Sequence, residues 1–176
     1  MSRPECIPAT WRDQGSAERA AFRHCWTYRP APDADPLGFV VRYERTDGGK
    51  IVVPFFRHNG TPGQFKAGAA AEPRPLFGLD RLDAPGPLYV VEGEKDASAL
   101  HRLGFAAVTA PGGSKAADRA DWQPVREAIA AGRCVRVWPD ADGPGRAYAV
   151  TVADQLAGAC DCLITAPAGL PAIEGA

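Results

Sequence analysis

One stretch of the chain, residues 88–96, constrains the fold more than any other, and it reads Leu-Tyr-Val-Val-Glu-Gly-Glu-Lys-Asp. Its first four residues are apolar and two of them are β-branched, which predicts a buried strand of a parallel sheet. Gly93 then permits a tight turn, and apolar residues recur at helical spacing over residues 94–103. The stretch therefore predicts a strand–turn–helix unit. Glu92 lies at the carboxyl end of its strand, where open α/β sheets bind ligands.

A second apolar run, residues 134–138, leads directly into an acidic turn in which Asp140 and Asp142 lie two residues apart. If the two strands belong to one parallel sheet, Glu92, Asp140 and Asp142 converge on one edge of it. Mg²⁺ and related divalent cations prefer such oxygen ligands, and phosphoryl-transfer sites use them to neutralise charge on the attacking and leaving oxygens. We therefore predict that these three carboxylates are metal ligands and catalytic residues.

The acidic turn at residues 140–143 allows three other interpretations. It matches the start of an EF-hand calcium loop, but Pro144 and Thr151 occupy later ligand positions of that loop. It also resembles the nucleophile loop of haloacid-dehalogenase phosphatases, which need a downstream lysine, whereas no lysine follows Lys115. Finally, Asp and Gly are common in solvated turns of no special function. Two acidic motifs at strand ends in one α/β frame favour the metal site.

The chain before these motifs predicts a different architecture. Residues 1–24 are expected to be an N-terminal extension, with one or two helical turns over residues 17–22. From residue 25 the pattern becomes strand-like, and residues 37–44 and 50–56 flank the turn-forming sequence Thr-Asp-Gly-Gly, which predicts an antiparallel hairpin. Residues 25–82 are therefore expected to form a small antiparallel β-rich subdomain. The Pro- and Gly-rich residues 83–87 mark the boundary after it.

Beyond this boundary, strands and helices alternate at the spacing of βαβ units. Strands are expected at residues 88–91, 105–109, 134–138 and 160–165, and helices at residues 94–103, 118–131 and 144–156. Residues 83–167 are therefore predicted to form an α/β domain with a parallel four-stranded sheet flanked by helices. Residues 168–176 are expected to be a C-terminal tail.

Composition indicates a soluble globular protein, with 45% hydrophobic and 23% charged residues. The chain has no apolar run that could span a membrane and no signal-peptide core at its start, and its five cysteines form no disulfide-like framework. These features favour a cytoplasmic location. Up to Leu82 the chain carries 12 Lys and Arg against 9 Asp and Glu, and beyond it 8 against 12. A mildly basic front half suits a polyanionic partner.

Taken together, the two acidic motifs resemble the Toprim domain of phage- and plasmid-type DNA primases, whose signature is a Glu after the first strand and an Asp-x-Asp after the third. The turn Pro-Gly-Gly-Ser at residues 111–114 and the helix start at Gly145 and Arg146 also resemble that branch. Upstream, the segments at residues 26–29, 41–43, 49–50 and 75–78 resemble the small subdomain that precedes Toprim in these primases.

This resemblance implies a Toprim, Rossmann-like sheet and a primase-like nucleotidyltransferase that makes RNA primers on single-stranded DNA during DNA replication. It implies Mg²⁺ or Mn²⁺ as cofactor, held by Glu92, Asp140 and Asp142. Toprim folds also serve nucleases, so phosphodiester cleavage is an alternative, and a non-catalytic nucleic-acid-binding module is another. The chain has neither a Cys-x-x-Cys pair nor a Walker A loop. Besides single-stranded DNA and NTPs, the expected partners therefore include a separate helicase or zinc-binding template-recognition module.

Five further residues are candidates for binding the phosphates of a nucleotide: Lys95, Gly112, Gly113, Ser114 and Arg146. Lys95 follows the first acidic turn, and the glycine-rich turn offers backbone N–H donors. Arg146 lies just inside a predicted helix N-terminus beside the acids. An ordinary solvated lysine and an ordinary βα turn explain the first two features equally well.

The β-rich subdomain also carries candidates for contact with a nucleic acid. Its basic residues could follow the phosphate backbone and its aromatic residues could stack on bases. The basic candidates are Arg42, Lys50, Arg57 and Lys66, and the aromatic ones are Tyr43 and Phe65.

Overall fold

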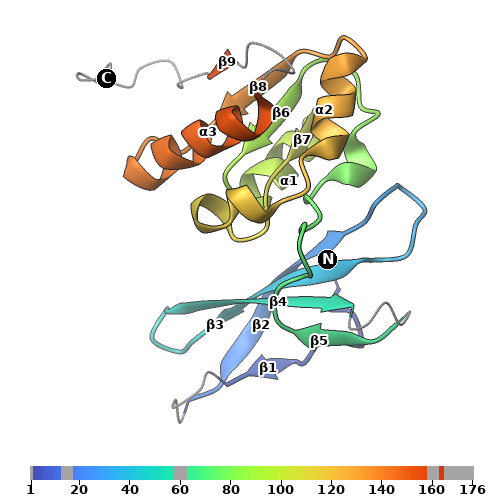
Figure 1. Ribbon diagram of the computed structural model, residues 1–176. Helices are drawn as coiled ribbons and strands as arrows, with labels where there is room; N and C mark the ends of the chain where they lie inside the picture. The colour runs from blue at the N-terminus through green and yellow to red at the C-terminus, as the bar shows by residue number, and fades with distance from the viewer. Residues whose placement is uncertain (1, 13–17, 58–62, 158–162, 165–176) are drawn as a thin grey trace. The chain divides into compact units, whose positions relative to one another are not determined.

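The computed structural model describes residues 2–12, 18–57, 63–157 and 163–164, apart from the side chains of 114, 163 and 164 (Figure 1). The chain divides into two compact units, Met1–Ala71 and Glu72–Ala176. The expected strand at residues 160–165 lies partly outside the described residues, and the expected tail lies entirely outside them.

The first unit is a five-stranded antiparallel sheet with the strand order β1-β2-β3-β4-β5. The strands are β1 (Thr10–Trp11), β2 (Ala20–Tyr28), β3 (Gly38–Glu44), β4 (Lys50–Arg57) and β5 (Phe65–Ala67). The predicted hairpin is confirmed as β3 and β4, whose last ladder pair before the turn joins Glu44 and Lys50. Gly48 turns the chain with a φ of 82°, a left-handed conformation that favours glycine.

The prediction of helical turns over residues 17–22 is wrong for its described part, because β2 already begins at Ala20. Phe22 pairs with Tyr43 of β3, and the two aromatic side chains contact one another at 6.4 Å between ring centroids. Cross-strand pairing and burial thus override the local helix propensity of the alanines. Alternate residues of β3, namely Phe39, Val41 and Tyr43, enter the hydrophobic core of this unit.

The second unit contains a parallel sheet with the strand order β7-β6-β8-β9. Its strands are β6 (Leu88–Val91), β7 (Ala106–Val108), β8 (Val135–Trp138) and the two-residue β9 (Leu163–Ile164). The helices are α1 (Glu94–Arg102), α2 (Gln123–Ala130) and α3 (Gly143–Leu156), with 3₁₀ turns at η1 (Leu79–Arg81), η2 (Gly113–Lys115) and η3 (Ala117–Arg119). The predicted α/β order and parallel pairing are confirmed.

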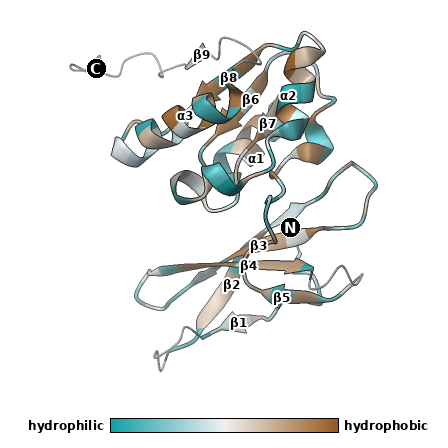
Figure 2. Ribbon diagram, in the orientation of Figure 1, coloured by the Kyte–Doolittle hydropathy of each residue, from teal (hydrophilic) through white to brown (hydrophobic). Residues whose placement is uncertain are grey.

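Alternation along the parallel strands separates two faces of this sheet. Leu88, Val90, Val135 and Val137 are buried in one hydrophobic core with residues of α2 and α3, and Figure 2 shows the hydrophobic character of β6 and β8. The intervening residues belong to the other face, where α1 packs on β6 and β7 and Trp138 stays 37% exposed. This second face therefore has room for a pocket.

Helix α2 is shorter than the predicted helix over residues 118–131. Pro124 lies in its first turn, as expected, because proline lacks the N–H that an interior helical position needs. The backbone before it is engaged elsewhere: Asp121 N donates to Arg74 O at 2.7 Å, and Arg74 N donates to Arg119 O at 2.8 Å. Trp122 is buried and donates from Nε1 to Ala117 O at 2.8 Å. These contacts keep the segment before Gln123 out of the helix.

Among the described helices, none combines the length and the apolar character that a membrane span requires.

Candidate functional site

The parallel pairing of β6 and β8 brings the two acidic motifs to one edge of the sheet. Val91 and Trp138 are partners in the ladder, so the residues that follow them leave the sheet side by side. Glu92 comes directly after β6, and Asp140 comes two residues after β8. The juxtaposition predicted from the sequence is therefore present in the backbone.

Asp142 holds the start of α3. It is the N-cap residue, and its Oδ1 accepts a hydrogen bond from Gly145 N at 2.8 Å. A carboxylate at this position satisfies a backbone donor and interacts favourably with the helix dipole. Asp142 therefore has a structural role, whatever else its carboxylate binds.

Gly145 fixes the position of the loop that carries Asp140. A Cβ atom at Gly145 would lie 2.2 Å from Asp140 O and 2.8 Å from Asp140 N, which are backbone atoms that a side chain cannot displace cheaply. The first turn of α3 therefore packs directly on the backbone of Asp140. This close approach requires a glycine.

The glycine-rich turn after β7 lies against Glu92. Gly112 and Gly113 both have positive φ, 91° and 58°, and a Cβ atom at Gly113 would lie 3.3 Å from Glu92 O and 3.8 Å from Glu92 Oε1. The Oε2 atom of Glu92 is buried. The turn and the first acid of the site are therefore in contact, although they come from different βα units.

The electrostatics of the edge centre on Asp140. Partial burial raises the pKa of its carboxyl above the usual 3.8, the negative charges of Asp96 and Asp142 raise it further, and Lys95 opposes them. Asp96 was not among the residues predicted from the sequence. Asp96 lies in the first turn of α1. Its position at the end of the first acidic motif, residues 92–96, is the sequence feature that could have identified it. The edge thus concentrates negative charge that a cation would relieve.

Tyr148 is a second residue that the sequence did not predict to lie at the site. It is fully buried, its hydroxyl oxygen accepts a hydrogen bond from Ala110 N at 3.4 Å, and it also bonds to the side chain of Thr109. Burial raises the pKa of Tyr148 to about 12, and the charges of Glu92 and Glu94 act in the same direction. Tyr148 is therefore a neutral positioning residue that ties α3 to the chain leaving β7.

The cationic candidates are solvent-accessible. Lys95 and Arg146 are exposed in the first turns of α1 and α3, and Lys115, which was not among the five candidates, is also exposed at the end of η2. Ser114 contributes its backbone to η2. The five predicted phosphate-binding residues all follow strands of the parallel sheet. They lie in the loops or first helical turns beyond β6, β7 and β8.

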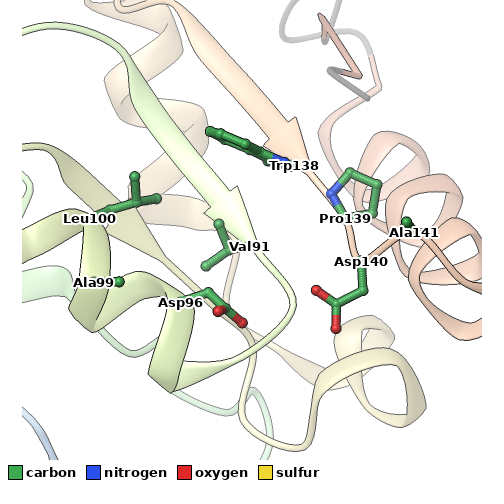
Figure 3. Close-up of a pocket in the computed structure, with 8 residues that line it drawn as sticks. All are labelled: Val91, Asp96, Ala99, Leu100, Trp138, Pro139, Asp140 and Ala141. Atoms are coloured by element: carbon green, nitrogen blue, oxygen red, sulfur yellow. The ribbon is translucent and has the colours of Figure 1, made fainter. Parts of the chain in front are cut away.

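A pocket of about 330 Å³ adjoins this edge on the face that carries α1. Figure 3 shows the ring of Trp138 at one end and the carboxylates of Asp96 and Asp140 at the other, with Val91 between them. The remaining lining residues are Ala99, Leu100, Pro139 and Ala141.

The donor set at the edge suits a hard divalent cation, because carboxylate oxygens are the ligands that Mg²⁺ prefers. Among the residues that the structure describes, no three Asp, Glu, His or Cys side chains are already gathered into a ligand set. Mg²⁺ commonly needs only one or two protein carboxylates, with waters and substrate phosphates completing its shell. The crowding around Asp140 fits that mode of binding, and the metal site stays a prediction.

The basic candidates of the first unit are engaged to different degrees. Arg42 Nη2 lies 2.8 Å from Glu44 Oε1, and Arg57 Nη2 lies 3.8 Å from Asp35 Oδ2. Lys50 and Lys66 are exposed.

The aromatic candidates of this unit are less accessible than expected. The expected stacking role of Tyr43 is wrong, because its side chain is fully buried and its hydroxyl donates to Pro8 O at 3.1 Å. Phe65 is half-buried, and its ring lies edge-on to that of Phe39.

Comparisons with known proteins find similarity among solved structures. No family model and no curated protein matches the chain. Among solved structures, a chain is similar to this one in the bacteriophage T7 assembly of lagging-strand DNA polymerase with the primase domains of two gp4 subunits, an RNA/DNA hybrid and dTTP. The identity is 18%, the TM-score is 0.49, and the match covers 90% of this chain and 73% of that one. The function of this chain is therefore inferred from its own residues.

Proposed function

We propose that this chain is a metal-dependent nucleotidyltransferase of the DNA primase type, built on a Toprim sheet, which makes RNA primers on single-stranded DNA. The observation that carries the proposal is the parallel pairing of Val91 with Trp138, which brings Glu92 and Asp140 to one sheet edge. Their motifs are those that resemble the Toprim signature. Asp142, which completes the Asp-x-Asp pair, is fixed at the start of α3 by its bond to Gly145 N.

Glu92, Asp140 and Asp142 would hold Mg²⁺ or Mn²⁺, which when bound supplies positive charge to the attacking and leaving oxygens of a phosphoryl transfer. The protein contributes the placement of these acids. Gly145 fixes the backbone of Asp140, and Gly113 packs against Glu92. Partial burial raises the pKa of Asp140, repulsion from Asp96 and Asp142 raises it further, and a bound cation would relieve that repulsion.

The phosphates of an incoming nucleotide would meet the exposed cations and backbone donors around the same edge. Arg146 lies in the first turn of α3, where the helix N-terminus also favours anions. Lys95 lies close enough to Asp140 to lower the pKa of that carboxyl. The position of the Lys95 ammonium group would therefore depend on the charge of Asp140. Gly112, Gly113 and the backbone of Ser114 lead into η2 beside Glu92.

Single-stranded DNA and NTPs are the proposed substrates, and a separate helicase or zinc-binding template-recognition module is the proposed partner. Lys50 and Lys66 of the first unit would contribute to DNA affinity through contacts with phosphates. The acids would not, because they repel a polyanion when no metal is bound.

The test offers the protein single-stranded DNA, labelled NTPs and Mg²⁺ or Mn²⁺, and scores primer synthesis and strand cleavage in the same reaction. Synthesis that is lost in Asp140→Asn and kept in Asp154→Asn supports the proposal. Asp154 is the matched control because it is an exposed acid of α3 far along the helix from Asp142. Cleavage without synthesis would replace the proposal by a nuclease. Binding without either reaction would replace it by a non-catalytic module.

A further inference from the structure

The pocket beside the acidic edge has charged, apolar and aromatic parts in that order along its length. The carboxylates of Asp96 and Asp140 lie at one end, the ring of Trp138 faces them from the other end, and Val91 lies between (Figure 3). Its volume of about 330 Å³ lies at the lower end of the roughly 300–1,000 Å³ that small-molecule sites span. The pocket therefore suits a small ligand that extends from the carboxylates to the ring.

The acidic end carries negative charge that no described side chain neutralises. Asp96 and Asp140 are exposed to solvent, and neither forms an ion pair with another residue of the described part of the chain. Lys95 lowers the pKa of Asp140, but this is the smallest of four influences and the other three raise it. An ionised carboxylate accepts hydrogen bonds and donates none. This end of the pocket therefore favours a cationic group with N–H donors.

The aromatic end also favours positive charge. Trp138 is 37% exposed although it ends a strand of the sheet, and its ring contacts Tyr89 at 6.0 Å between centroids. Tyr89 in turn contacts Phe105 edge-on at 5.6 Å, so the indole is supported by other rings. The face of an aromatic ring is the negative part of its quadrupole, and tryptophan attracts a cation over that face more strongly than tyrosine or phenylalanine does.

The middle of the pocket distinguishes an organic cation from a metal ion. Val91, Leu100 and Pro139 line it with apolar side chains, which offer no ligands to a metal. A hydrated metal ion would use the acids alone. An aliphatic chain would in addition bury apolar surface against these side chains.

We propose that this pocket binds an aliphatic diamine, with one ammonium group at the carboxylates of Asp96 and Asp140 and the other over the face of Trp138. This ligand site goes beyond nucleotidyl transfer and does not depend on it. Asp140 is also a proposed metal ligand, so a diamine and a divalent cation would compete for one carboxylate. Each should therefore weaken the binding of the other.

The experiment measures the dissociation constants of putrescine, butylamine and butanol by ligand-observed NMR titration, with a chelator present and at constant ionic strength. These probes share one aliphatic chain and carry two, one and no ammonium groups. Because the carboxylates are exposed, we expect dissociation constants on the order of millimolar. Putrescine should bind about threefold or more tightly than butylamine, and butanol should not bind.

Variants of Trp138 test the aromatic end. Trp138→Leu keeps an apolar side chain and removes the ring, so it should weaken putrescine by about threefold or more and leave butylamine within about twofold of wild type. Trp138→Phe keeps an aromatic face that attracts cations less strongly, and its affinity for putrescine should lie between those of wild type and Trp138→Leu.

An acid variant tests the other end. Asp96→Asn should weaken putrescine and butylamine alike, by about threefold or more, because both ligands lose one charged acceptor. Asp154→Asn removes an exposed acid of α3 that does not line the pocket and should leave both affinities unchanged.

Equal affinities of putrescine and butylamine for wild type, or unchanged putrescine binding in Trp138→Leu or in Asp96→Asn, would overturn the proposal. Equal weakening in Asp96→Asn and Asp154→Asn would overturn it in favour of unspecific attraction to an acidic surface. If putrescine binds as expected and primer synthesis is absent, the proposed function fails and the diamine site stands. If primers are made and no diamine binds, the diamine site fails and the proposed function stands.

Discussion

The charged residues of the antiparallel sheet and those at the acidic edge of the parallel sheet are arranged in opposite ways. In the antiparallel sheet, charges lie along the strands and meet partners of opposite sign, as Arg42 and Arg23 do at Glu44, at 2.8 and 3.5 Å. In the parallel unit, Asp140 lies beyond a strand end, where partial burial raises the pKa of its carboxyl and the negative charges of Asp96 and Asp142 raise it further. Opposite-sign pairs on a solvated face add little stability. A group of like charges lowers stability, and a bound cation would offset that cost.

Two glycines beside acidic turns, Gly48 and Gly145, show a related contrast. In the first unit, Gly48 turns the β3–β4 hairpin with a positive φ, and a Cβ atom there would meet nothing within 4 Å. In the second unit, a Cβ atom at Gly145 would meet the backbone of Asp140 at 2.2 Å. The first glycine serves the turn itself, whereas the second holds an acid in place. Close packing of a glycine on the backbone of an acid distinguishes the edge at Asp140 from an ordinary acidic turn.

The largest effect should come from removing the central acid. Asp140→Asn should lower primer synthesis by more than about a hundredfold, because even groups that only support metal ligands typically contribute 10–100-fold. The measurement is the initial rate of primer formation with saturating NTPs, with Asp154→Asn as the control that keeps its activity. If Asp140→Asn retains the wild-type rate, the parallel unit does not carry the reaction.

The second effect tests whether glycine packing distinguishes the site. Gly145→Ala must displace the backbone of Asp140, and overpacking of this kind costs about 1–3 kcal/mol. We expect the thermal midpoint to fall by roughly 5–10 °C. Gly143→Ala, two residues earlier, meets only Arg146 Nη2 at 4.0 Å and should change the midpoint by less than about 2 °C. Equal losses in the two variants would contradict the account.

A smaller effect concerns DNA affinity in the first unit. Replacing Arg42 and Lys50 together by Ala should weaken single-stranded DNA binding. The slope of log affinity against log salt concentration should become shallower by about 0.7 for each phosphate that the protein no longer neutralises. Lys50→Ala alone should account for most of the change, since Arg42 is held by Glu44. Fluorescence anisotropy at several salt concentrations measures both quantities. Unchanged affinity and slope in the double variant would place the DNA-binding surface elsewhere.

The smallest effect is on stability without metal. Because the pKa of Asp140 is raised in the folded state, the folded chain holds this proton more tightly than the unfolded chain. The resulting stabilisation is complete below the usual pKa of 3.8 and is lost as the pH rises through the raised value. With a chelator at pH 7, Asp140→Asn should therefore melt on the order of 1 °C higher than wild type, a difference that vanishes at low pH. A lower midpoint at pH 7 would show that the carboxylate is stabilising.

The sequence predicted those parts of the fold whose signals lie within a few neighbouring residues. The β3–β4 hairpin and the β6–α1 unit were predictable because turn residues and apolar spacing fall within a few positions. The two-residue β1 and three-residue β5 were not, since pairing with a neighbouring strand defines them. The burial of Tyr43 was predictable in principle, because it alternates with Phe39 and Val41 on one face of β3.

The candidate site divides in the same way. Glu92, Asp140 and Asp142 occur in two short motifs, so the parallel pairing of β6 and β8 suffices to bring their backbone positions to one edge of the sheet. Asp96, Trp138 and Tyr148 lie at the edge or its pocket because α1, β8 and α3 pack around it, and no single stretch of sequence specifies that packing. Local patterns identified the charged groups, and tertiary packing determined which neighbours surround them.

The central claim, that the edge of the parallel sheet binds a divalent cation, is tested most directly by titrating Mn²⁺ and measuring the free ion by electron paramagnetic resonance. Wild type and Asp154→Asn should show the same saturable site. Asp140→Asn should bind at least about tenfold more weakly. Equal Mn²⁺ affinity in wild type and Asp140→Asn would contradict the claim.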